Sequence, residues 1–142
     1  MRFPLLLTSI WIALLPLSVS AQSLKEKRAQ QDINQDLQEA AKNANDACGS
    51  SITAEYDYSG VKPEDYDKYS VAGYCSEVLS AIAGVCSDDM GKDAVKQKIT
   101  KVVCKVGPQR TIELAGGTVS YTIQWDTANN SDYISEYLMK SL

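Results

Sequence analysis

SVAGYCSEVLSAIAGVC, residues 70–86, is the stretch of the chain that decides the fold. Its apolar residues recur every three or four positions from end to end, a spacing typical of a helix with one buried face. We therefore predict one continuous helix whose two cysteines both point inward. The predicted buried face comprises Val71, Tyr74, Cys75, Val78, Leu79, Ile82, Val85 and Cys86.

The chain has four cysteines, and their spacing restricts how they can pair. An even number in an exported protein predicts two disulfides, and the chain lacks the close cysteine pairs typical of a zinc site. A helix over residues 70–86 holds Cys75 and Cys86 about 16 Å apart, which is beyond disulfide reach. Two pairings remain, either Cys48–Cys86 with Cys75–Cys104 or Cys48–Cys75 with Cys86–Cys104. We prefer the first, because the strand after Cys48 leads away from it and the predicted helix returns.

The chain begins MRFPLLLTSIWIALLPLSVSAQS, which has the pattern of a secretory signal peptide. Arg2 precedes an apolar run of about fifteen residues, and small residues lead up to a cleavage point after Ala21. The alternative, a membrane anchor, would need roughly twenty unbroken apolar residues with better charged flanks. We therefore expect a secreted or periplasmic protein with a signal peptide at residues 1–21, one disulfide-stapled domain at residues 22–142, and no membrane span after cleavage.

Helical periodicity also occurs on both sides of the central stretch. An alanine-rich stripe over residues 23–47 predicts a long first helix, which Gly49 ends. A short helix is predicted near residues 92–97. Asn129 and the two polar residues after it offer N-caps to a closing helix.

Alternating apolar and polar residues predict four strands, near residues 52–58, 101–106, 111–114 and 118–125. The last two strands flank Gly116-Gly117, a hairpin signal. Residues 61–68 are rich in charge and predict a surface loop. The element order is α-β-α-α-β-β-β-α, which predicts an α+β two-layer domain of about four mainly antiparallel strands covered by helices on one face.

The composition excludes several kinds of chemistry. The chain has no histidine, so Ser-His-Asp and Cys-His catalysis are excluded. It has no glycine-rich phosphate loop, and its formal net charge of −4 argues against binding a phosphate backbone. We therefore expect no cofactor, no metal and no nucleic-acid partner.

Carboxylates are the remaining route to catalysis, and they leave open whether the protein is an enzyme. Glycoside cleavage needs two carboxyl groups about 5–10 Å apart. Acidic residues in loops are more often turn formers and helix caps. A carboxylate-dependent hydrolase is therefore the least favoured of three function classes, with candidates Glu64, Asp65, Asp67, Asp88 and Asp89.

Five tyrosines fall within EYDYSGVKPEDYDKYSVAGY, residues 55–74. Tyr56 and Tyr58 share the predicted buried face of a strand, and Tyr74 lies on the helical stripe, so we expect these three in the core. The other two lie in the charged loop, and tyrosine is enriched in binding interfaces. The candidate binding surface therefore comprises Tyr66, Tyr69, Asp65 and Asp67.

The favoured function is a small exported binding module of inhibitor, immunity or receptor type, whose partner is another exported protein or a glycan. The alternative is a structural or accessory envelope protein that assembles through its long first helix. Five lysines form a basic stretch that we interpret as solvated faces of a helix and a strand. They are Lys92, Lys96, Lys98, Lys101 and Lys105. Asn129-Asn130-Ser131 fits the N-glycosylation pattern, which applies if the source is eukaryotic.

Overall fold

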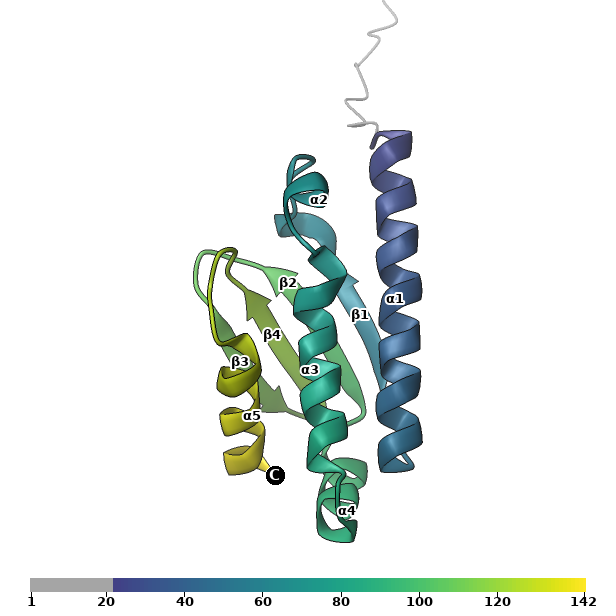
Figure 1. The fold of residues 1–142 in the computed structure, drawn as a ribbon, viewed down its shortest axis with the longest axis vertical. Helices are drawn as coiled ribbons and strands as arrows, with labels where there is room; N and C mark the ends of the chain where they lie inside the picture. The colour runs from purple at the N-terminus through teal and green to yellow at the C-terminus, as the bar shows by residue number, and fades with distance from the viewer. Residues whose placement is uncertain (1–21) are drawn as a thin grey trace, which may run out of the picture.

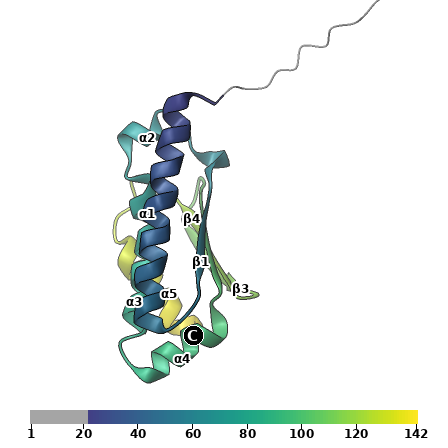
Figure 2. The same ribbon diagram turned by 90° about the vertical axis from the view of Figure 1, so that its right-hand side faces the viewer.

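A computed structural model describes residues 22–142, and the predicted signal peptide at residues 1–21 lies outside the described residues. Helices α1, α3 and α5 lie side by side over one face of a four-stranded sheet (Figure 1), and the described helices leave the other face uncovered (Figure 2). The predicted two-layer α+β architecture is therefore confirmed. The elements in chain order are α1 (Leu24–Cys48), β1 (Thr53–Asp57), a 3-10 turn (Tyr58–Gly60), α2 (Asp65–Lys68), α3 (Val71–Val85), α4 (Asp89–Lys98), β2 (Lys101–Val106), β3 (Thr111–Ala115), β4 (Thr118–Ile123) and α5 (Asn130–Ser141).

The sheet is mixed, which corrects the prediction of mainly antiparallel strands. Its order is β1-β2-β4-β3, in which β1 with β2 and β2 with β4 are parallel and β3 with β4 is antiparallel. The chain crosses from β1 to β2 through α3 and α4, so it enters the sheet again in the same direction. The predicted hairpin turn at Gly116-Gly117 is present, but β4 returns between β2 and β3 and so runs parallel to β2.

One hydrophobic core fills the space between the two layers. Alternation along β2 and β4 turns one set of side chains towards the helices, and the stripe predicted on α3 packs against them. These side chains are almost completely buried. They include Val78, Leu79, Ile82, Val102, Cys104, Val119, Tyr121 and Ile123.

Helix α1 begins and ends where its sequence provides caps. The Ser23 hydroxyl accepts a hydrogen bond from the Glu26 amide, and Gly49 takes the left-handed conformation, φ 64°, that ends the helix. Its buried face has large side chains in the first half and small ones in the second, and the small ones allow α1 to pack closely beside α3. The buried residues are Ile33, Leu37, Ala41, Ala44 and Cys48.

Two disulfides join α3 to its neighbours, as predicted. Cys48–Cys86 ties the end of α1 to the end of α3, and Cys75–Cys104 ties α3 to β2. All four cysteines are buried. Two buried disulfides are consistent with an extracellular or otherwise oxidising compartment. Within residues 22–142, no helix has both the length and the apolar character needed to cross a membrane.

The charged stretch at residues 61–68 is more ordered than the predicted loop. It contains the single turn α2, and the Asp65 side chain is buried rather than solvated. One Asp65 carboxylate oxygen accepts a hydrogen bond from the Lys62 amide at 2.9 Å. This bond explains the difference, because a short aspartate side chain can accept a hydrogen bond from a backbone amide of its own turn and remain buried.

Candidate functional site

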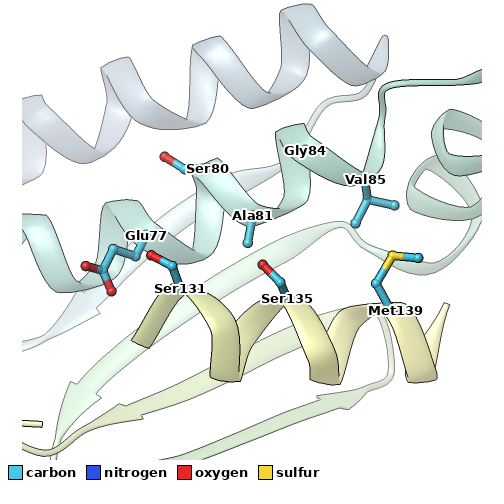
Figure 3. A pocket seen from close by; sticks show the side chains of 8 residues that line it. All are labelled: Glu77, Ser80, Ala81, Gly84, Val85, Ser131, Ser135 and Met139. Carbon is cyan, nitrogen blue, oxygen red and sulfur yellow. The ribbon is translucent and has the colours of Figure 1, made fainter. Parts of the chain in front are cut away.

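A groove runs along the outer surface between α3 and α5. It consists of two adjoining hollows, of about 590 Å³ and about 410 Å³, which share Glu77 and Ser131. The two helices run in the same direction, because Glu77 faces Ser131 at one end and Val85 faces Met139 at the other (Figure 3). Both hollows fall within the size range of ligand sites.

The larger hollow lies at the start of both helices and is polar. Its lining consists mainly of hydroxyl, amide and carboxylate side chains. Among the described residues, no lysine or arginine lines it. The lining residues are Ser70, Gly73, Tyr74, Glu77, Thr127, Asn129, Asn130, Ser131 and Asp132.

The smaller hollow continues the groove towards the ends of the helices and becomes apolar. Ala81 and Val85 lie on one wall, and Met139, which is 72% exposed, lies on the other. Gly84 leaves this part open, since a Cβ placed on it would meet no described atom within 4 Å. The groove therefore presents an apolar surface beside a polar one.

Glu77 lies where the two hollows meet and carries a buried polar atom without a partner in the described part of the chain. Its Oε2 atom is buried and has no hydrogen-bond partner among the described residues. Burial raises the pKa of the Glu77 carboxyl above its ordinary value, because the charged form loses hydration. A buried polar atom without a partner and a desolvated carboxylate are both features of functional sites.

Hydrogen bonds fix the wall that α5 contributes. The Asn130 Oδ1 atom accepts hydrogen bonds from Arg110 Nη1 at 2.9 Å and from the hydroxyls of Tyr121 and Thr127, each at 3.1 Å. The Arg110 guanidinium also lies 4.1 Å from the ring centroid of Tyr133. The start of α5 is therefore held in place before any ligand binds.

Stacked aromatic rings fix the opposite corner of the polar hollow. Tyr74 meets the ring of Trp125 edge-on at 5.1 Å, and Trp125 stacks on Tyr69 at 4.3 Å. The Tyr69 hydroxyl donates a hydrogen bond to Asp126 at 2.8 Å. Tyr69, predicted as a binding residue, does not line the groove. It stacks on Trp125, which in turn contacts the lining residue Tyr74.

The predicted binding residues are divided between two other surfaces. Tyr66 and Tyr69 together line a hollow of about 260 Å³ beside α1, and Tyr66 and Asp67 line another of about 330 Å³. The Tyr66 hydroxyl accepts a hydrogen bond from Gln30, and Asp67 pairs with Lys25 at 2.6 Å. Asp65 faces the turn it stabilises. The binding role of these four residues stays a prediction.

The basic stretch is mostly engaged within the molecule. Lys101 pairs with Glu55 at 2.9 Å, and Lys98 donates hydrogen bonds to the last two backbone carbonyls of the described chain. Lys92 and Lys96 lie within 4.0 Å of acidic residues on their own helix. This arrangement agrees with the interpretation as solvated faces.

Glu77 was not predicted as a site residue, although the sequence contains a signal for it. Glu77 is the one charged residue in the stretch 70–86. A lone carboxylate in an apolar helix predicts a special environment, because ionisable groups are costly to bury. Its neighbours across the groove come from α5, more than fifty residues later in the chain.

No protein-family model, curated protein or solved structure matches the chain. Within residues 22–142, no group of three or more potential ligands gathers in a way that could hold a metal ion.

Proposed function

We propose that this protein is a small exported binding module whose α3/α5 groove holds an extended segment of a partner protein. The observation that carries the proposal is the buried, unpartnered Oε2 of Glu77 at the junction of a polar and an apolar hollow. A ligand that supplies a donor to the Glu77 carboxylate would offset part of the cost that the free protein bears.

The shape of the groove favours a chain segment over a compact ligand. The groove follows α3 from Ser70 to Val85, so it spans fifteen residue steps of helix, or about 22 Å. An extended peptide covers that length with about seven residues. Docking of a peptide segment into a surface groove is a common mode of recognition.

The groove also favours binding over the other two classes of function. A structural protein that assembles through α1 would use the outer face of that helix, and no residue of α1 lines the groove. A glycoside hydrolase would need a second carboxyl group, and Asp132 is the one that shares the polar hollow with Glu77. If the parent protein hydrolysed a glycan and both Glu77→Gln and Asp132→Asn lost that activity, the hydrolase would become the better explanation.

The direct test is to block the groove and leave the fold unchanged. Gly84→Trp places a large ring in the apolar hollow, where a Cβ meets no described atom. Ser120→Trp is the matched control, because Ser120 is exposed on the uncovered face of the sheet. Both variants should keep the circular-dichroism spectrum of the parent.

Peptides selected from a displayed random library against the parent protein are then measured with each variant. We expect selected peptides to bind the parent and Ser120→Trp with equal affinity and Gly84→Trp at least about tenfold more weakly, a loss of about 1.4 kcal/mol. Equal binding to both variants would show that the groove is not the site. Binding of glycans instead of peptides would change the class of partner.

A further inference from the structure

We infer that the segment held by the α3/α5 groove carries a lysine or arginine opposite Glu77 and an apolar residue two to four positions away, beside Met139. The inference rests on the proposed function and specifies the chemistry of the partner. It is based on the charges in and around the groove and on the distance between its polar and apolar parts.

The charges that line the groove all have one sign. Glu77 and Asp132 are the charged residues among the linings of the two hollows. A neighbouring hollow between α1 and α3 shares Ser70 and Gly73 with the polar one, and it adds Asp36 and Glu39. An incoming cation would therefore meet a surface of complementary charge, which steers association.

Two cations, Arg110 and Lys140, lie on the α5 side of the groove. The Arg110 guanidinium donates to the Ala128 carbonyl and to Asn130, and it covers the ring of Tyr133. Lys140 lies 4.0 Å from Glu136, on the same helix. Neither cation lines either hollow, so the negative charge of Glu77 is left for a ligand to neutralise.

An anionic ligand is disfavoured, although two helices begin at the polar hollow. The first amides of α3 and α5 carry partial positive charge. Asp132 lies in the first turn of α5, and Glu77 lies in the hollow itself. An anion would therefore face two carboxylates in a partly desolvated place, where like charges repel most strongly.

The preference for an apolar residue in the ligand follows from the apolar hollow near the ends of α3 and α5. Gly84 lies seven residues beyond Glu77 on α3, a rise of about 10 Å. An extended segment advances about 3.3 Å per residue, so two to four residues span this distance, given the reach of a lysine or arginine side chain. Met139 offers a flexible and polarisable surface there, which suits aliphatic side chains of different shapes.

Three synthetic peptides test this chemistry on the intact protein. The basic probe is acetyl-Ser-Lys-Ser-Leu-Ser-Leu-Ser-amide. The acidic probe has glutamate in place of lysine, and the polar probe has serine in place of both leucines. The ε-methyl NMR signal of Met139 reports on the groove, and that of Met90, exposed on α4, reports on nonspecific effects.

We expect the basic probe to shift Met139 and not Met90, with an affinity about tenfold above those of the acidic and polar probes. Glu77→Gln should reduce the affinity for the basic probe about tenfold, and Glu77→Lys should reverse the preference in favour of the acidic probe. Glu113→Gln, which removes one exposed charge from β3 outside the groove lining, should leave the affinities unchanged.

The outcomes separate the inference from the function on which it rests. Basic and acidic probes that bind equally, and that Gly84→Trp excludes equally, would overturn the charge preference and leave the groove as the site. Probes that bind Gly84→Trp as well as the parent would overturn both. A Met139 signal that no probe moves would overturn the inference, while library peptides excluded by Gly84→Trp would still support the groove.

Discussion

At the scale of single residues, Glu77 is a carboxylate in an otherwise uncharged helix, and its cost to the fold can be measured. Burial raises the pKa of its carboxyl above the ordinary value of 4.5. A raised carboxyl pKa means that the folded state holds the proton more tightly than the unfolded state. Stability therefore falls as the pH rises from the unfolded value through the folded one, and it stays lower above it.

Replacing this carboxylate by its neutral isostere tests that reasoning. We expect Glu77→Gln to be more stable than the parent at pH 7, by up to about 1 kcal/mol, and to differ little at pH 3. The measurement is urea unfolding at both pH values. A parent that is the more stable protein at pH 7 would mean that Glu77 has a partner in solution.

Three tyrosines that lie close to one another beside α1, away from the groove, offer a matched comparison of hydroxyl groups. The Tyr58 hydroxyl donates a hydrogen bond to Asn34 Oδ1 at 2.7 Å, and the Tyr66 hydroxyl accepts one from Gln30 at 2.7 Å. Both tyrosines are therefore hydrogen-bonded to α1. The hydroxyl of Tyr56 is buried without a partner among the described residues. Its pKa is strongly raised, mainly because burial disfavours the phenolate.

Substitution by phenylalanine should therefore act in opposite directions. We expect Tyr58→Phe and Tyr66→Phe each to lose about 0.5–1.5 kcal/mol, and Tyr56→Phe to be neutral or more stable. Chemical unfolding gives the free energies, and hydrogen exchange of the first turns of α1 should speed up in the first two variants alone. A loss in Tyr56→Phe would point to a buried water at its hydroxyl.

At the scale of elements, α3 supports most of the structure. It lies between α1 and α5 and packs on the sheet, and its residue Cys75 and its C-cap Cys86 each form one of the two disulfides. It also contains Gly84, although glycine weakens the interior of a helix. Since a Cβ at Gly84 would meet no described atom, the fold itself does not require glycine there.

Replacing this glycine by alanine tests whether the groove has room for a side chain at this position. We expect Gly84→Ala to stabilise the protein by about 0.5–1 kcal/mol in thermal or urea unfolding. Gly91→Ala is the contrasting variant, because its Cβ would clash with the carbonyl oxygen of Val85, and it should destabilise the protein. A destabilised Gly84→Ala would show that the groove is narrower in solution.

Some elements of the fold could be predicted from the sequence and others could not. The helix at residues 70–86 was predictable because a stripe of period 3.6 is a local signal, and excluding a Cys75–Cys86 bridge needed no more than helical geometry. The position of β4 between β2 and β3 was not predictable, because it depends on pairing between distant segments. The groove could not be predicted for the same reason, since it exists only where α5 packs beside Glu77.

At the scale of the whole molecule, the disulfides hold the layers together. They enclose sequence separations of 38 and 29 residues. Closure entropy depends on the logarithm of loop length, so the two should contribute similar amounts.

Replacing either pair of cysteines by alanine should cost about 2–4 kcal/mol in urea unfolding. The two double variants are Cys48→Ala with Cys86→Ala and Cys75→Ala with Cys104→Ala. A much smaller loss for one of them would identify a bridge whose strain in the native state cancels its benefit.

The two bridges overlap in the sequence, so residues 48–104 form one covalently closed block. The β3–β4 hairpin and helix α5 follow that block in the chain, and noncovalent contacts alone hold them packed against it. Tension applied to the C-terminus would therefore peel α5 away first and remove one wall of the groove, while the cross-linked block kept its shape. A segment bound across both walls would oppose that peeling, so occupancy of the groove would set the force at which the end of the chain gives way.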